Sequence, residues 1–310
     1  MTAIESKKTK VNPSISKISM LMSATCMGIV GLFVTFLGSF EVYTIVLLRG
    51  IFGALFLTLF LIKSRSFSKA FFKESFRFHW KALLISGLVY PFVIYFYFFT
   101  IISYGYAIAA FLLYTSGIFV LIFIIITKMN KVSKITIMSF ILAIIGVAII
   151  MEFWNGLIIT LGLITGILSG LTLAIFVFYK KIIYNKRNNI KIELKAEGDF
   201  DTFLAWWHVL FLIFVFLPIG FLDLLKLTFL ELIIAILLGL ISTALAFTLY
   251  NVGIKNDEGG NIIILSYIEP VVATILAVLI LRTLSIFTII GGSMILCANF
   301  IVLKYSNRNK

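Results

Sequence analysis

The chain has 310 residues, of which 62% are hydrophobic and only 13% are charged, and its mean hydropathy is +1.15. A soluble domain has about 25% charged residues and could not bury this much apolar surface, so a soluble fold is excluded and lipid must surround most of the chain. The formal net charge of +13 would suit a nucleic-acid-binding protein, but the Lys and Arg residues lie between apolar stretches, so they indicate membrane topology and no nucleic-acid partner is expected.

Ten apolar stretches are long enough to cross the membrane as helices, since about 20 residues span about 30 Å of hydrocarbon. The stretches are apolar all round rather than alternating, which excludes barrel strands. We therefore predict an all-α polytopic membrane protein. In chain order the predicted spans are Ile18–Leu37, Tyr43–Ile62, Ala82–Thr100, Tyr106–Thr127, Ile135–Met151, Leu157–Tyr179, Phe203–Phe221, Glu231–Tyr250, Asn261–Leu281 and Ile286–Leu303.

The positions of the 26 Lys and Arg residues support this count. If the N-terminus is cytoplasmic, only Lys226 and Arg282 fall in outer loops, Arg49 lies within a span, and all the others face the cytoplasm. Positive charge gathers on the cytoplasmic side of membrane proteins. We therefore predict a plasma-membrane protein with both termini cytoplasmic, and a first span that is retained because it lacks a cleavage signature.

The spans divide into two sets of five. Tyr114-Thr115-Ser116-Gly117 in the fourth span aligns with Tyr267-Ile268-Glu269-Pro270 in the ninth. Because five is odd, the second set enters the membrane inverted, and inverted repeats place a substrate site near the midplane; chance similarity of two apolar stretches is the alternative. The predicted units are a cytoplasmic tail over 1–17, five-helix repeats over 18–151 and 157–303, and a cytoplasmic tail over 304–310.

Several short motifs occur in one order along these spans. The run Leu265–Ala273 (LSYIEPVVA) resembles a "Leu-Glu-Pro-Val-x-Ala" helix, and Gly291–Leu296 resembles a "Gly-Ala-x-Leu-Ile-Leu" run. Leu48-Arg49-Gly50 and Gly146-Val147 complete the series. With these motifs the chain resembles the drug/metabolite transporter superfamily, of the EamA-like type, from about Ile18 to Leu303. The resemblance implies ten transmembrane helices in two halves and the transport of small molecules.

Glu269 is the one acidic residue of 13 that lies deep within a predicted span. A charged group there is costly unless it is paired or faces water, and Pro270 leaves a backbone carbonyl without its helical donor. One interpretation is a cavity-lining carboxyl that binds substrate or a proton. The other is a kink and packing motif in which Glu269 is hydrogen-bonded between helices.

Further side chains in the spans are candidates for the same site. Tyr95 and Tyr114 lie too deep for interfacial tyrosines, and with Tyr267, Ser116 and Glu269 they are predicted to bind substrate, interhelical hydrogen bonding being the alternative. Arg49 is interpreted as a structural anchor that reaches the outer surface or Glu41, or as a guard against cations. Small residues on one face permit close helix packing and sliding, which predicts a structural and gating role for Gly162, Gly166 and Gly170.

The sequence contains no GxSxG, HExxH, Walker A or GxGxxG motif. We therefore expect no enzyme, no metal and no cofactor, although a proton could be coupled through Glu269. The favoured function is a secondary transporter, in the direction of export, that moves small amphipathic metabolites such as amino acids by alternating access. Its partners are then a small-molecule substrate and membrane lipids. The alternatives are a non-transporting scaffold, a lipid-handling protein, or a membrane-embedded lipid-modifying enzyme, which would need clustered His, Asp or Glu.

Overall fold

The computed structural model describes residues 13–66, 68–117, 119, 122–123, 134–150, 152, 154, 160–188, 198–254, 265, 268–282 and 285–306. All the regular elements among them are helices. The first half of the chain contributes α1 (Pro13–Gly28), α2 (Val30–Phe36), α3 (Val42–Lys63), α4 (Lys69–Tyr104), α5 (Tyr106–Leu113) and α7 (Lys134–Ile150). The second half contributes α8 (Leu161–Asn188), α9 (Phe200–Gly220), η3 (Phe221–Lys226), α10 (Phe229–Gly239), η4 (Leu240–Leu245), α11 (Ala246–Ile254), α12 (Ile268–Leu276), η6 (Ala277–Leu281) and α13 (Ile286–Ser306).

The predicted spans correspond to these helices in order. Within the described residues, six helices have the length and apolar composition to cross a membrane, and three shorter apolar helices lie at the fifth, ninth and tenth predicted spans. The fourth predicted span is described only over α5 and a few residues after it. The chain is therefore an all-helical membrane protein, and its helices agree with ten spans in two five-helix halves.

Three helices differ in detail from their predicted spans. The first span is interrupted at Ile29, between α1 and α2. The third is part of a longer helix, because α4 begins at Lys69 with the hydroxyl of Ser68 accepting from the Phe71 amide. The eighth consists of α10, the π-helical turn η4 and α11. Hydropathy alone does not reveal these features, because a polar extension or a widened turn leaves the apolar count almost unchanged.

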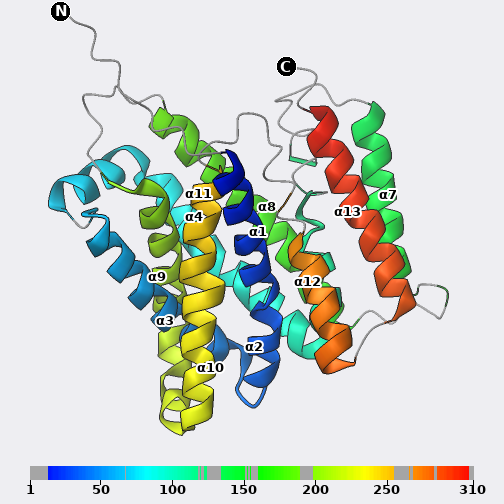
Figure 1. Cartoon of the computed structure of the whole chain (residues 1–310), viewed down its shortest axis with the longest axis horizontal. Coiled ribbons are helices and arrows are strands. Elements are labelled where there is room, and N and C mark those ends of the chain that lie inside the picture. The colour runs from blue at the N-terminus through cyan, green and yellow to red at the C-terminus, as the bar shows by residue number, and fades with distance from the viewer. Residues whose placement is uncertain are drawn as a thin grey trace, which may run out of the picture.

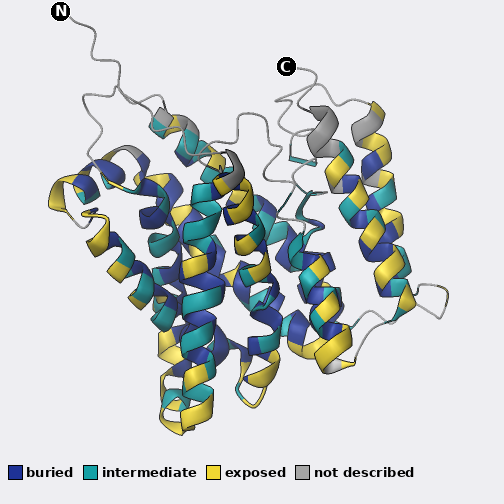
Figure 2. Cartoon of the chain, viewed as in Figure 1, coloured by how far each residue is buried: buried dark blue, intermediate teal, exposed yellow. Residues whose placement is uncertain are grey.

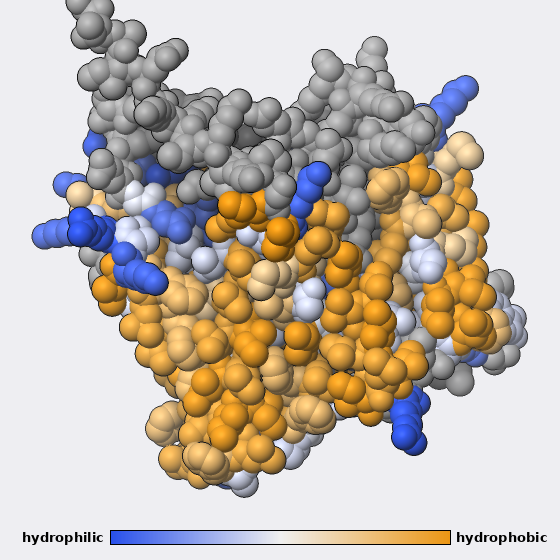
Figure 3. Space-filling view, viewed as in Figure 1, coloured by the Kyte–Doolittle hydropathy of each residue, from blue (hydrophilic) through white to orange (hydrophobic). Residues whose placement is uncertain are grey.

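The outer surface is apolar, as lipid requires. Phe214, Leu222, Leu225, Phe229 and Leu279 are each at least 67% exposed. Figure 3 shows hydrophobic residues over most of the described surface in that view, with hydrophilic residues at its margins. A soluble monomer rarely exposes such a continuous apolar area, so this surface faces the hydrocarbon.

The helix contacts are similar when the two halves of the chain are exchanged. The larger contacts between helices that are not consecutive in the chain occur in matched pairs when the two halves are exchanged: α4 packs on α8 as α1 packs on α11, and α4 packs on α9 as α10 packs on α3. The pairs α3·α9, α5·α12 and α7·α13 are their own counterparts. This pattern agrees with two halves related by a pseudo-two-fold axis.

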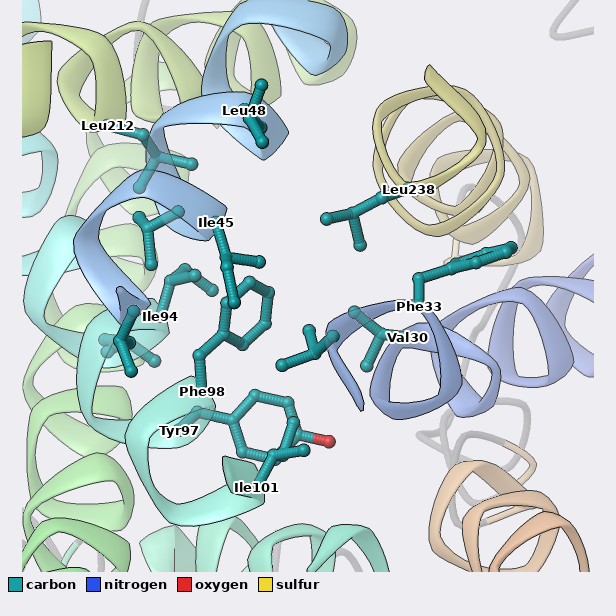
Figure 4. Packing of buried hydrophobic residues seen from close by; sticks show 14 of the residues in the cluster. Val30, Phe33, Ile45, Leu48, Ile94, Tyr97, Phe98, Ile101, Leu212 and Leu238 are labelled. Carbon is teal, nitrogen blue, oxygen red and sulfur yellow. The ribbon is translucent and has the colours of Figure 1, made fainter. Parts of the chain in front are cut away.

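The main core lies where the two halves meet. It includes apolar residues of α2, α3 and α4 from the first half and of α9 and α10 from the second. Figure 4 shows Ile45, Phe98 and Leu212 converging there from three helices. The α7·α13 pair stands at one edge of the bundle (Figure 1) and exposes a large part of its outer face (Figure 2). The start of α1 and the end of α13 lie at the same end of the bundle (Figure 1).

A second cluster ties α4, α8 and α9 together at the polar end of the bundle. Arg187 on α8 forms an ion pair of 3.1 Å with Glu74 on α4, and both side chains are largely buried. The guanidinium of Arg187 also lies 3.9 Å from the centre of the Phe200 ring. The hydroxyl of Ser66 accepts a 2.7 Å hydrogen bond from the Asp199 amide, which joins the start of α9 to the end of α3.

Candidate functional site

Glu269 and Tyr114 meet between the two halves. Glu269 lies in the first turn of α12, and Tyr114 directly follows the last residue of α5. The Tyr114 hydroxyl donates a 3.1 Å hydrogen bond to Oε2 of Glu269. Because α5 and α12 pack against each other and belong to the fourth and ninth spans, this bond joins corresponding parts of the two halves. It is also the interhelical hydrogen bond that the packing interpretation of Glu269 expects.

A close approach of α1 fixes the start of α12. A Cβ atom on Gly28 would lie 2.7 Å from Cβ of Val272 and 3.0 Å from the carbonyl oxygen of Glu269. Only a residue without a side chain allows α1 to pass this close to the backbone of α12. The Glu269 carboxyl is therefore positioned by its own helix, by α1 and by the hydroxyl of Tyr114.

Two further tyrosines bring hydroxyl groups towards this carboxyl. The Tyr97 side chain projects from α4 into the interior (Figure 4). Tyr97 is within electrostatic reach of both Glu269 and Arg49. Tyr106 on α5 is within reach of Tyr97 and Glu269, and its ring lies directly over Gly31. Both tyrosines are buried, so their hydroxyls add polarity to an otherwise apolar interior.

Arg49 lies in the same interior region and is only 6% exposed. Its Nη2 donates a 3.3 Å hydrogen bond to the carbonyl of Ser242 in η4, and its guanidinium lies 5.4 Å from the centre of the Phe98 ring. Ser242 in turn donates 2.9 Å to the carbonyl of Cys26 on α1. Arg49 is thus directed inward, and the alternative in which it reaches outward to Glu41 does not agree with this geometry.

The remaining predicted site residues lie apart from this group or beside it. Tyr95 stacks on Phe216 of α9, with ring centres 5.6 Å apart and an interplanar angle of 19°, so it faces a different helix from Tyr97. The backbone of Ser116 lies against Gly170 of α8. Tyr267 is outside the described residues. Pro270 is buried in α12 and its carbonyl accepts from Thr274.

The three glycines of α8 all face the first half. A Cβ atom on Gly162 would lie 2.5 Å from the Tyr104 ring and 2.7 Å from Cβ of Ser103. Gly166 faces Leu112 in the same way, and Gly170 packs against the backbone that follows α5. The stripe therefore lies along α4 and α5, the helices that carry the tyrosines of the site.

Sequence reasoning missed Tyr90, Tyr97 and Tyr106 as members of the group and separated Arg49 from Glu269. One signal was present: Tyr90 and Tyr97 are seven residues apart, which places them on one face of α4, whereas Tyr95 lies about 200° around the helix from Tyr97 at 100° per residue. The depth of a residue in the membrane does not reveal this, because depth depends on position along the helix and not on the direction of the side chain.

The chemistry available is that of a polar binding site. The Glu269 carboxyl is hydrogen-bonded to Tyr114, and the Arg49 guanidinium and the hydroxyls of Tyr97 and Tyr106 lie within electrostatic reach of one or the other end of this group. No cluster of three or more His, Cys, Asp or Glu residues that could hold a metal ion occurs among the residues that the structure describes. The arrangement suits reversible binding of a solute that carries polar groups.

Comparisons with known proteins agree with this architecture. Residues 15–152 and 160–304 each match the model of the EamA-like transporter family. The search of curated proteins finds no match. Fifteen chains of solved structures match; one of them, a crystal structure, aligns with a TM-score of 0.59 and 14% identity over 96% of this chain and 98% of its own. At this identity the likeness shows the fold alone.

Proposed function

Because the chain belongs to the EamA-like transporter family, we propose that it is a plasma-membrane exporter of small amphipathic metabolites, such as amino acids, that works by alternating access. Membership of the family makes the chain a membrane transporter with a small-molecule substrate and not an enzyme. In inverted-repeat transporters the substrate site lies between the halves, and the halves rock around it. The direction of transport, the substrate class and the alternating-access mechanism are our proposal.

The observation that carries the proposal is the Tyr114–Glu269 hydrogen bond between the two repeats. It supports the proposal because it joins the one carboxyl deep within the spans to the other half, at the boundary that alternating access would open. A rocking motion of one half would separate or reorient α5 and α12, so the environment of Glu269 would change with each transport cycle.

Glu269 is proposed to carry the coupling proton. A carboxyl in an apolar interior avoids ionisation unless it is paired, since an isolated buried charge is costly. It can therefore hold a proton when the site is closed and release it when a polar substrate or water solvates the group. Exchange of a proton for substrate at one residue would couple export to the proton gradient.

Glu269→Gln tests this role, because it retains the shape and hydrogen-bonding capacity of the side chain but cannot titrate. We expect the Gln variant to exchange substrate between equal pools and to lose accumulation driven by a pH gradient in proteoliposomes. Glu41→Gln is the matched control, since Glu41 is exposed before α3 and its side chain makes no capping hydrogen bond. Full gradient-driven transport by the Glu269→Gln variant would exclude the proton role and favour the packing interpretation.

A further inference from the structure

Among the residues that the structure describes, four buried polar atoms in the region of Arg49 and Glu269 form no hydrogen bond. They are Nε of Arg49 and the hydroxyl oxygens of Tyr90, Tyr97 and Tyr106, on residues that are 6%, 4%, 3% and 1% exposed, respectively. About nine in ten buried polar groups in proteins are hydrogen-bonded, and groups that are not require an explanation. All four can donate, so an acceptor is what the interior lacks at this place.

These atoms belong to one place in the fold. The Tyr90 hydroxyl lies beside the Arg49 guanidinium, although not in hydrogen-bond geometry with it. Tyr97 is within electrostatic reach of Arg49 on one side and of Glu269 on the other. Tyr106 is within electrostatic reach of Tyr97 and Glu269, and its hydroxyl lies near the Gly31 backbone, although not in hydrogen-bond geometry with it. The donors therefore extend from the guanidinium on α3 towards the carboxyl on α12.

We propose that Arg49, Tyr90 and Tyr97 form an anion subsite that binds a carboxylate group of the transported solute. This proposal rests on the proposed transport function and names the chemical group that the site selects. A guanidinium presents a planar fork of donors that matches a carboxylate, and such charge-assisted hydrogen bonds are the strong ones. The solute carboxylate would supply the acceptor that Nε of Arg49 and the two hydroxyls now lack.

The charges favour a monoanion over a phosphate. Arg49 is the one cationic residue within the predicted spans, and the Glu269 carboxyl acts on the same region. A phosphate dianion would face one positive charge and a nearby carboxyl, whereas a carboxylate is balanced by the guanidinium alone. The Phe98 ring beside the guanidinium and the tyrosine rings would contact an apolar body attached to the carboxylate.

Arg49 is also held by the second half of the chain. Its Nη2 is bonded to the Ser242 carbonyl in the π-helical turn η4, and π-helical turns frequently occur at functional sites. Ser242 in turn is bonded to α1 through Cys26. A solute bound at Arg49 would thus contact a residue of the first half that is anchored on the second, which places the subsite at the moving boundary.

Isosteric pairs of ligands test the subsite independently of transport. Binding to the purified full chain in detergent is measured by calorimetry for hexanoate and hexanamide, phenylacetate and phenylacetamide, and phenylalanine and phenylalaninamide. We expect at least one pair to show a preference of about tenfold or more for the carboxylate, which corresponds to about 1.4 kcal/mol. If no pair shows such a preference, the subsite is overturned.

Tyrosine variants identify the side chains that produce the preference for a carboxylate over an amide. Tyr97→Phe and Tyr90→Phe should each weaken carboxylate binding about five- to tenfold and amide binding by less, because a neutral amide is the weaker acceptor. Their thermal stability without ligand should equal that of the wild type or exceed it, because the deleted hydroxyls have no partner. Tyr95→Phe is the matched control, since Tyr95 stacks on Phe216 and belongs to another face of α4. An equal loss of carboxylate binding in Tyr95→Phe and Tyr97→Phe would refute the assignment.

Transport by the same protein in proteoliposomes separates the two proposals. If carboxylates bind selectively but none of the compounds tested crosses the membrane, the subsite stands and the transport proposal fails for these solutes. If the amides are bound and carried as well as the carboxylates, the transport proposal stands and the subsite is refuted.

Discussion

The crossing of α7 and α13 depends on two glycines that face each other's backbone. A Cβ atom on Gly291 would overlap the carbonyl oxygen of Gly146 and lie 3.1 Å from the amide nitrogen of Ile150. A Cβ atom on Gly146 would lie 2.6 Å from the carbonyl oxygen of Gly291. Backbone atoms cannot rotate away as a flexible side chain can, so Gly291→Ala must push the two helices apart.

The expected cost follows from two opposing effects. Overpacking of a close contact destabilises a protein by about 1–3 kcal/mol, while Gly→Ala within a helix contributes about 0.8–1.0 kcal/mol of stabilisation through helix propensity. Gly291→Ala should therefore lower stability by about 1 kcal/mol net. Gly253→Ala is the control, because its nearest neighbours, Cβ and Cε of Met20, lie 3.1 Å away, so the substitution needs a smaller adjustment and should cost less than Gly291→Ala.

Thermal unfolding in detergent measures both variants. The double variant Gly146→Ala/Gly291→Ala should cost less than the sum of the two single changes, because the first substitution already opens the crossing for the second. A Gly291→Ala protein that unfolds at the same temperature as Gly253→Ala, or above it, would refute the reasoning. So would strict additivity in the double variant.

Two other predictions concern the polar ends of the bundle. Glu74→Gln should lower stability by about 3 kcal/mol, because it leaves the buried Arg187 without its carboxylate. Lys226→Ala breaks the exposed pair with Asp223 and should cost less than about 1 kcal/mol. Thermal unfolding measures both variants, and equal losses of stability would contradict the difference in burial. A cysteine introduced at Lys226 should react with a membrane-impermeant thiol reagent added outside intact cells, and one at Lys69 should react only after permeabilisation. Labelling at position 69 but not at position 226 in intact cells would refute the predicted orientation.

The membrane architecture could be predicted from the sequence to a large extent. Span length, apolar composition and the positions of Lys and Arg are properties of the chain in one dimension, and the bilayer acts on each segment separately. The apolar helices therefore appear in the predicted order, and the resemblance carried by runs such as Leu265–Ala273 is confirmed by the family match. The sequence also indicated Glu269 as a candidate site residue, because burying a single acidic side chain deep in a membrane span costs free energy wherever its helix packs.

The composition of the site could be predicted only in part. Glu269 and Tyr114 are brought together, but Tyr97 rather than Tyr95 faces them, because two residues turn a helix by about 200° and only packing sets which face turns inward. An outward reach was one alternative for Arg49 and a guard of the cavity another; its partner is the Ser242 carbonyl, 193 positions away in the chain. Such contacts exist only once two distant helices have docked, so the tertiary structure alone decided which polar groups share the interior. The sequence by itself determined where the chain crosses the membrane, since crossing depends on local hydrophobicity.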